Sequence, residues 1–130
     1  GTFIGMTMDT TRADMTQAVL EGVAFALRDS LEIAKDLGIR IERTKICGGG
    51  AKSPLWRQMI ADILNLKVDL ILAAVANKEF ESVEDAAEKL IRITATIEPD
   101  PETVDLYEER YQKFRRIYPG LKNIFKEIVR

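Results

Sequence analysis

Hydrophobic positions recur at three- and four-residue intervals in the first third of the chain, which predicts one long helix. Thr11-Arg12-Ala13-Asp14 has the spacing of a capping box at its start. Gly38 suits the left-handed residue that ends many helices, and Ile39 can supply the hydrophobic contact after it. Residues 2–8 are apolar and β-prone and predict a strand or an extended lead-in. The recurring helical positions are Met15, Val19, Gly22, Val23, Ala26, Ser30, Ile33, Ala34 and Leu37.

The middle of the chain changes from a strand-like to a helix-like pattern and back. Residues 41–47 predict a strand that leads directly into Gly48-Gly49-Gly50-Ala51. Ser53 followed by Pro54 predicts the start of a second helix, because serine is a favoured N-cap and proline fits the first helical position. Residues 67–71 predict a second strand. The apolar side of the second helix consists of Leu55, Trp56, Met59, Ile60, Ile63 and Leu64.

Three further elements are predicted towards the C-terminus. A capping box at residues 82–85 opens a helix to about Ile91, and residues 93–97 alternate like a strand. Asp100-Pro101 starts a last long helix, which Pro119-Gly120 is expected to break before a short amphipathic tail. Helices interleaved with short strands indicate a single α/β domain. One stripe of the last helix is aromatic or apolar: Val104, Tyr107, Tyr111, Phe114 and Tyr118.

The segment from Lys67 to Asn77 changes from strand-like to helix-like composition without a turn residue before Asn77. A strand that turns back into a helix normally needs glycine, proline, asparagine or serine between the two. We therefore expect that a loop is missing near residues 70–71.

Composition indicates a soluble globular domain, since 46% of the residues are hydrophobic and 31% are charged. The formal charge of −2 argues against nucleic acid as a partner. The longest apolar run, Leu70 to Ala76, is too short to cross a bilayer. The start has no initiator methionine, so we expect the chain to continue upstream. A single cysteine excludes an internal disulfide and suits the cytoplasm.

The absence of histidine narrows the possible chemistry. A Ser-His-Asp centre, a Cys-His centre and a zinc site of the usual Cys/His kind all require histidine or several cysteines. These 130 residues therefore contain none of those sites.

The strongest chemical signal is the sequence of strand, three glycines, small residue and well-capped helix. Without side chains at residues 48–50, a phosphate or a flat ligand can approach the backbone closely. The N–H groups at the start of the helix near Pro54 favour an anionic or polar ligand at the same end. The carboxyl end of a strand is also where open α/β sheets bind ligands.

Two familiar phosphate-binding motifs do not fit this turn. A Walker loop requires glycine before Lys52-Ser53, where this chain has Ala51. A Rossmann fingerprint requires a third glycine at position 53, which is serine. The spacing alone leaves open a tight turn whose glycines only let strand and helix pack together.

Other conspicuous residues are interpreted as structural. Cys47, at the end of an apolar strand, is predicted to be a small buried core residue. The tyrosine stripe is predicted to be a packing face. Trp56 either fills the core or forms the wall of a purine pocket, and we favour the core. A solvent-exposed face is predicted for Lys113, Arg115 and Arg116.

Four segments together resemble the C-terminal domain of the FGGY carbohydrate kinases, and among these the xylulokinases most. They are Thr7-Met8-Asp9-Thr10-Thr11-Arg12-Ala13-Asp14, Ala18-Val19-Leu20-Glu21-Gly22-Val23-Ala24-Phe25, Gly48-Gly49-Gly50-Ala51-Lys52-Ser53-Pro54-Leu55-Trp56-Arg57-Gln58, and Tyr107-Glu108-Glu109-Arg110-Tyr111-Gln112-Lys113-Phe114. The resemblance covers nearly the whole chain. It implies the C-terminal half of a two-domain sugar kinase with a ribonuclease H-like fold of the actin/Hsp70 type.

The resemblance also implies that ATP lies against the glycine turn. Carried over to this chain, Gly49, Gly50 and Ala51 are the main nucleotide contacts, with Gly48 and Ser53 next to them. Gln58 is a further contact, while Glu21 and Gly22 help to pack the long helix beneath the site. The family's Gly-Ala-Ala stretch after the second strand has no counterpart here, which agrees with the expected missing loop.

The resemblance further implies Mg²⁺-dependent transfer of the γ-phosphoryl group of ATP to D-xylulose in the full-length enzyme. The catalytic aspartate and the first phosphate-binding loop belong to the family's N-terminal domain and have no counterpart in this chain. We therefore expect the isolated domain to be inactive, and an exposed apolar face to allow a homo-oligomer. The alternatives are another FGGY kinase (for gluconate, ribulose or glycerol) and a non-catalytic nucleotide-binding or association module.

Overall fold

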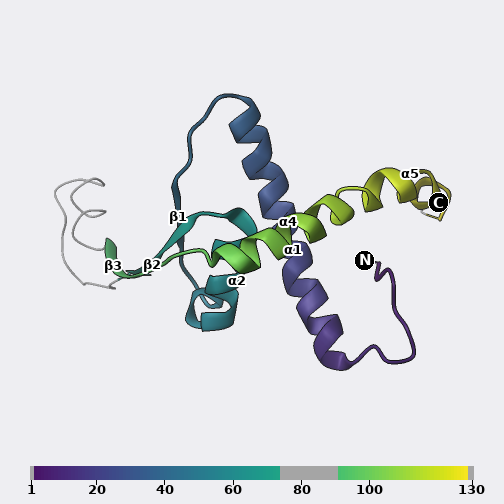
Figure 1. The fold of residues 1–130 in the computed structure, drawn as a ribbon, viewed down its shortest axis with the longest axis horizontal. Helices are drawn as coiled ribbons and strands as arrows, with labels where there is room; N and C mark the ends of the chain where they lie inside the picture. Colours follow the sequence, from purple (N-terminus) through teal and green to yellow (C-terminus); the bar gives the residue numbers. More distant parts are fainter. Residues whose placement is uncertain (1, 74–90, 129–130) are drawn as a thin grey trace.

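The computed structural model describes residues 2–73 and 91–128 (Figure 1). A three-stranded sheet lies to one side of two crossing helices, α1 and α4, and α5 lies at the opposite end (Figure 1). The mixed α/β class predicted from the sequence is confirmed. In chain order the elements are α1 (Arg12–Asp36), β1 (Arg43–Ile46), the 3-10 turn η1 (Gly50–Lys52), α2 (Pro54–Leu64), β2 (Lys67–Ala73), β3 (Ile91–Ile97), α4 (Pro101–Phe114) and α5 (Ile117–Ile128).

Both predicted ends of α1 are confirmed by hydrogen bonds. The Asp14 N–H donates to the Thr11 hydroxyl over 3.2 Å, and the Thr11 N–H donates to the Asp14 carboxylate over 2.8 Å. The hydrogen bonds from the Thr11 side chain and backbone lower the pKa of Asp14. At the other end Gly38 has φ +83°, and the Ile39 N–H reaches the Ala34 carbonyl over 3.1 Å. Of the two alternatives predicted for residues 2–8, the strand is wrong, since these residues form no strand.

The sheet has the order β1-β2-β3, with β1 and β2 parallel and β2 and β3 antiparallel. Parallel neighbours need a crossover, and α2 supplies it between β1 and β2. The second strand continues to Ala73 rather than ending at Ile71, with a register shift between Leu70 and Ile71. The residues after Leu70, whose composition is helix-like, therefore form strand as far as Ala73. The expected missing loop stays a prediction, and the helix predicted from Ser82 lies outside the described residues.

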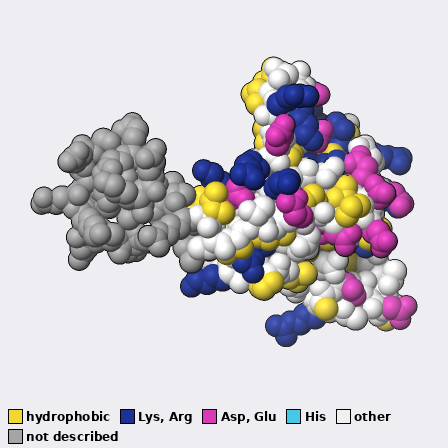
Figure 2. All heavy atoms as spheres, turned by 60° about the vertical axis from the view of Figure 1, so that its left-hand side comes forward, with side chains coloured by type: hydrophobic (Ala, Val, Ile, Leu, Met, Phe, Trp, Pro, Cys, Tyr) yellow, Lys and Arg dark blue, Asp and Glu magenta, His cyan; other side chains and the backbone are white. Residues whose placement is uncertain are grey.

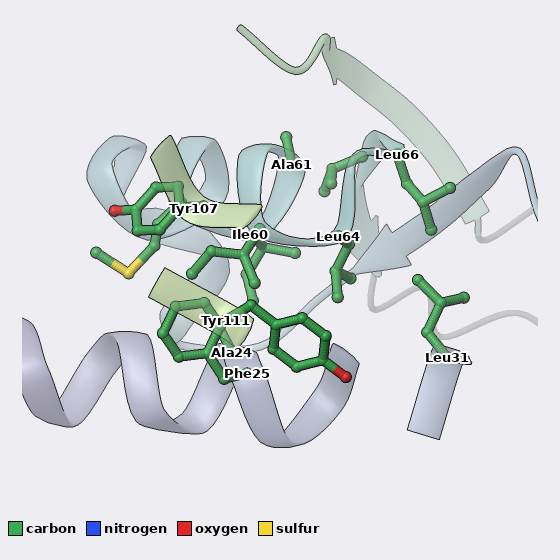
Figure 3. Packing of buried hydrophobic residues seen from close by; sticks show 12 residues of the cluster. Ala24, Phe25, Leu31, Ile60, Ala61, Leu64, Leu66, Tyr107 and Tyr111 are labelled. Carbon is green, nitrogen blue, oxygen red and sulfur yellow. The ribbon is translucent and has the colours of Figure 1, made fainter. Parts of the chain in front are cut away.

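The core forms around α2, whose residues Met59 to Leu64 are all buried. Helix α1 packs on one side of it, while α4 and β2 pack on others (Figure 3). A helix that is buried on every side is part of the core rather than a surface element. The cluster consists of Ala24, Phe25, Leu31, Met59, Ile60, Ala61, Ile63, Leu64, Leu66, Val68, Tyr107 and Tyr111.

One polar residue of α2 is buried in the core with its hydrogen bonds satisfied. The Asp62 carboxylate accepts from the Asp100 N–H and from the Gln58 amide, each over 2.8 Å. Asp100 is itself the predicted N-cap of α4, since its side chain accepts from the Glu102 N–H over 3.0 Å. Asp62 thereby fixes where α4 begins relative to α2.

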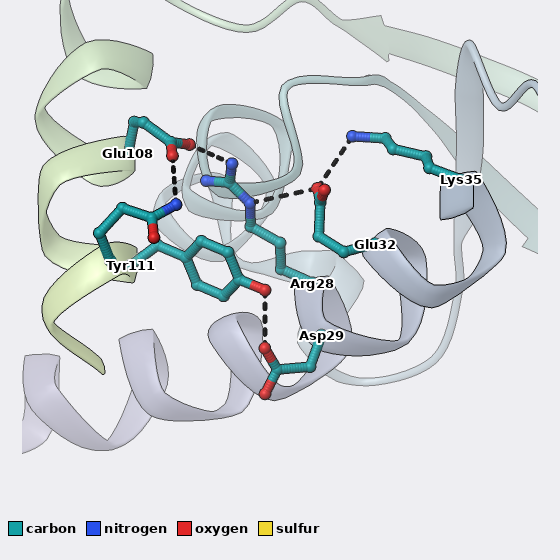
Figure 4. A network of polar contacts seen from close by, with 7 residues as sticks. Arg28, Asp29, Glu32, Lys35, Glu108 and Tyr111 are labelled. Atoms are coloured by element: carbon teal, nitrogen blue, oxygen red, sulfur yellow. Dashed lines mark hydrogen bonds and ion pairs between the residues drawn. The ribbon is translucent and has the colours of Figure 1, made fainter. Parts of the chain in front are cut away.

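A polar network holds α4 against α1 (Figure 4). The Tyr111 hydroxyl donates to Asp29 over 2.6 Å, and the Arg28 guanidinium lies 4.2 Å from the centre of the Tyr111 ring. Arg28 also forms ion pairs with Glu32 on its own helix and Glu108 on α4. The aromatic stripe is thus a packing face as predicted for Tyr107 and Tyr111, whereas Tyr118 is exposed.

The position of the break after α4 differs from the prediction. Helix α4 ends at Phe114, and Pro119 and Gly120 lie within α5 instead of interrupting it. Pro119 occupies the first turn of α5, where the backbone N–H has no intrahelical partner in any case. Lys113, Arg115 and Arg116 are exposed as predicted.

We predict that Tyr111→Phe lowers the free energy of unfolding by about 1–3 kcal/mol, because the Asp29 carboxylate loses a short hydrogen bond. Tyr118→Phe is the matched control, since Tyr118 is 61% exposed and should change stability by less than about 0.5 kcal/mol. Urea unfolding followed by fluorescence of the single tryptophan measures both variants. Equal stability of the two variants would contradict a stabilising role for the hydroxyl.

Stability should also fall in alkaline solution. Burial raises the pKa of Tyr107 and of Tyr111 to about 12, with the charge of Glu21 adding to the first and the Asp29 hydrogen bond to the second. Because unfolded tyrosine ionises near pH ~10, folding favours the neutral phenols. The stabilisation that the two neutral phenols give to the folded state is complete below about pH 10 and is lost as the pH rises towards about 12. Unfolding measured at about pH 8, 10 and 11 should show this loss, and a smaller one in Tyr111→Phe.

Candidate functional site

The glycine turn, residues 48–52, joins the carboxyl end of β1 to the start of α2. Gly48 has φ +82°, which a residue with a side chain rarely adopts. Gly49 has φ −62° and ψ −42°, which any residue tolerates. Two backbone hydrogen bonds close the turn, from Lys52 N–H to the Gly49 carbonyl and from Ser53 N–H to the Gly50 carbonyl, each over 3.1 Å.

The turn presents backbone donors in succession. Among the described residues, no acceptor takes the N–H groups of Gly49, Gly50 and Ala51. The three glycines are exposed, whereas Ala51 is 3% exposed and anchors the turn in the protein. Successive N–H groups of a turn form a concave site for an anion. This arrangement suits a phosphate lying against the backbone.

The first turn of α2 supplies fewer free N–H donors for an anion than the sequence predicted. Ser53 is the N-cap as predicted, and its hydroxyl accepts from the Trp56 N–H over 3.3 Å. Pro54 has no N–H, and the Arg57 N–H reaches the Ser53 carbonyl over 3.1 Å. In the described part of the chain, only Leu55 among the first-turn donors has no protein acceptor. Most donors for an anion therefore come from the glycine turn.

Trp56 lies directly beneath the turn. A Cβ atom added at Gly50 would be 3.2 Å from both Cδ1 and Nε1 of the indole, closer than ordinary contact. At Gly48 and Gly49 the same atom would meet nothing within 4 Å. On another side, Trp56 lines an apolar groove of about 370 Å³ between α1, β1 and α2. The predicted core position of Trp56 is only half correct, because its side chain is partly buried and packs against the core from the edge.

One sequence-based expectation in this region is contradicted by the structure. Cys47 is exposed, because β1 ends at Ile46 and Cys47 begins the exposed turn. The prediction that it is a buried core residue is therefore wrong. The Gln58 amide donates to Asp62 over 2.8 Å and to the Glu98 carbonyl over 3.0 Å, so it ties α2 to the link between β3 and α4. Glu21 accepts from Arg110 over 2.6 Å and thereby joins α1 to α4.

A larger hollow of about 560 Å³ lies where the first turns of α1 and α2 approach α4. Sequence reasoning did not identify it, because its walls come from three elements that only tertiary packing brings together. Its polar groups are on α1 and its apolar groups mainly on α2 and α4. It is lined by Arg12, Ala13, Thr16, Gln17, Leu20, Leu55, Met59 and Tyr107.

The charges of the described residues give no dominant sign to the visible face, where positive and negative side chains are interspersed (Figure 2). In residues 2–73 and 91–128, no three Asp, Glu or Cys side chains lie close enough together to hold a metal ion. None of the described helices is both long enough and apolar enough to span a membrane.

Comparison with known proteins shows the family in which this chain, with its glycine turn, is found. A family model for the C-terminal domain of the FGGY carbohydrate kinases matches residues 1–76. The chain belongs to the FGGY family of carbohydrate kinases. The resemblance inferred from the four sequence segments is thus confirmed.

The relatives of this FGGY domain include the xylulose kinases of Staphylococcus epidermidis and Bacillus subtilis. They are 33% and 32% identical to it, over 99% and 95% of this chain and 28% and 27% of those proteins. The crystal structure of xylulose kinase from Rhodospirillum rubrum has a TM-score of 0.77 at 27% identity and covers 96% of this chain. That likeness confirms the expected actin/Hsp70-type fold. The chain spans about 28% of the length of the first of these relatives.

We predict that Gly48→Ala destabilises this FGGY domain by about 1–2 kcal/mol, because alanine is strained at φ +82°. Gly49→Ala should not destabilise it, since its backbone is right-handed and its Cβ would meet open space. Urea unfolding of both variants tests the geometry of the turn without any ligand. A loss for Gly49→Ala as large as that for Gly48→Ala would contradict it.

Proposed function

We propose that this FGGY domain binds ATP and ADP at the glycine turn and forms the nucleotide side of a kinase that phosphorylates D-xylulose. The observation that carries the proposal is the run of backbone N–H groups from Gly49 to Ala51 without described acceptors. They lie at the carboxyl end of β1, where open α/β sheets bind ligands. The family assignment adds phosphate chemistry to this geometry.

The proposed contacts follow from what each residue offers. Gly49 and Gly50 donate backbone N–H groups at positions where no side chain keeps a phosphate away. The Ala51 N–H follows directly after these two donors, and Gly48 supplies the left-handed bend that precedes them. Ser53 contributes by capping α2, which fixes the end of the turn.

We propose an indirect role in nucleotide binding for Gln58. Its amide nitrogen is engaged by Asp62 and Glu98, so we propose that it supports the nucleotide side through α2. A direct contact would require its amide oxygen, because both hydrogen bonds use the nitrogen.

Magnesium does not fit the described residues on their own. They offer no cluster of carboxylates, and Mg²⁺ in phosphoryl-transfer enzymes is held by carboxylates together with the phosphates. We therefore propose that the chain binds the nucleotide but transfers no phosphoryl group alone. Transfer depends on groups assembled around the phosphate, including a base for the sugar hydroxyl, and these residues do not supply that set.

D-xylulose is the acceptor that we propose, because two relatives named xylulose kinase align with nearly the whole chain. The exposed thiol of Cys47 suits a reducing compartment, so we propose a cytoplasmic location. Self-association is proposed through the apolar outer side of α1 and its C-cap, where Val19, Val23, Leu27, Ile33 and Leu37 are exposed.

Nucleotide binding can be tested by isothermal titration calorimetry of the 130-residue chain with ADP and ATP. We expect weak binding to the wild type and at least tenfold weaker binding to Gly49→Val, because two methyl groups then project from the face that takes the phosphate (about 1.4 kcal/mol or more). Gly22→Ala, in α1 and in contact with nothing at its Cβ, is the matched control and should bind normally.

Two outcomes would contradict the proposal. Unchanged binding to Gly49→Val would show that the glycine turn is not the contact. Phosphorylation of D-xylulose by this chain alone, measured as ADP release, would show that it contains the complete catalytic set.

A further inference from the structure

We propose that Trp56 is the positioning residue of the glycine turn: its indole edge supports Gly50 and holds the backbone donors in place for the nucleotide. This inference rests on the proposed nucleotide-binding function. Trp56 lies beneath the backbone rather than in the row of donors, so it acts through Gly50.

The turn needs such a support because glycine is the least restrained residue. Three consecutive glycines lose more conformational entropy on ordering than other residues, and in the described part of the chain two backbone hydrogen bonds close this turn. Within residues 2–73 and 91–128, Gly50 is the one of the three glycines whose added Cβ would meet a side chain. The indole therefore restricts Gly50, the middle one of the three residues whose N–H groups have no described acceptor.

Trp56 holds the turn in a second way through its backbone. Its N–H donates to the Ser53 hydroxyl, which caps α2 directly after the turn. Ser53 in turn donates its own N–H to the Gly50 carbonyl over 3.1 Å. Side chain and backbone of Trp56 thus converge on the same residue, one by contact and the other through Ser53.

The apolar groove explains why this contact is adjustable. Trp56 lines the groove between α1, β1 and α2, so its ring has space to withdraw from the turn. We therefore expect Gly50→Ala to fold and to displace the indole, rather than to prevent folding. Displacement should loosen the turn and weaken nucleotide binding.

A double-mutant cycle tests this inference, with ADP affinity measured by calorimetry. Gly50→Ala and Trp56→Leu should each weaken ADP binding about tenfold. A tenfold loss of affinity matches the entropy cost of ordering one additional backbone residue when ADP binds. The double variant should be no weaker than Trp56→Leu alone, because the added methyl group then has no indole to displace. Trp56→Phe should retain more affinity than Trp56→Leu, because a flat ring still fills part of the space.

Two controls separate positioning from general stability. Ile63→Val weakens the core of the same helix, so it should lower the unfolding midpoint and leave the ADP affinity unchanged. Leu55→Ala removes a neighbouring apolar side chain that is 65% exposed and should leave both unchanged. Because Trp56 is the only tryptophan, its emission spectrum should shift in Gly50→Ala but not in Leu55→Ala.

The outcomes distinguish the two proposals. If the wild type binds ADP, Gly49→Val does not, and Trp56→Leu binds like the wild type, the positioning role is wrong and the nucleotide site stands. Additive losses, about a hundredfold in the double variant, would likewise overturn the coupling between Gly50 and Trp56. If the wild type binds no ADP, both the proposed function and this inference are overturned.

Discussion

The burial of α2 is the constraint on which the rest of this domain depends. Six consecutive residues of this helix, Met59 to Leu64, are buried between α1, α4 and β2. Close packing leaves such a helix little freedom to shift along or about its axis. Ser53 fixes its start and Asn65, with φ 49°, its end, while Asp62 sets the start of α4. The glycine turn is attached to the N-terminus of this fixed helix, so its donors have a defined position relative to the core.

The three glycines of the turn are alike in sequence but differ in structure. Gly48 provides a left-handed bend, Gly49 leaves open space for a ligand, and Gly50 makes room for Trp56 below it. A methyl group added at Gly50 would therefore act on the indole below the turn. A side chain added at Gly49 would instead project into open space, and the backbone there accepts any residue.

The contact between α1 and α4 is polar and aromatic rather than purely aliphatic. Phe25 packs against the rings of Tyr107, Tyr111 and Phe114, with centroids 5.2–6.2 Å apart. Around this cluster Arg28 is paired with carboxylates on both helices, which offsets the desolvation of its charge. Since hydrogen bonds to charged groups are directional, the network fixes the register of α4 on α1 more tightly than apolar contacts alone.

The sequence by itself determined the starts of α1, α2 and α4, the α/β class and the place of the turn. Capping residues and glycines act over three or four neighbours, so Thr11, Ser53 and Asp100 could be identified from spacing alone. Tertiary structure decided what depends on distant segments: the exposure of Cys47, the direction of the Gln58 amide, and the position of Pro119 inside α5. It also decided that Gly50 lies against Trp56, because that contact depends on how β1 and α2 are placed together. Local propensities set where elements begin, and packing between elements sets what each residue can touch.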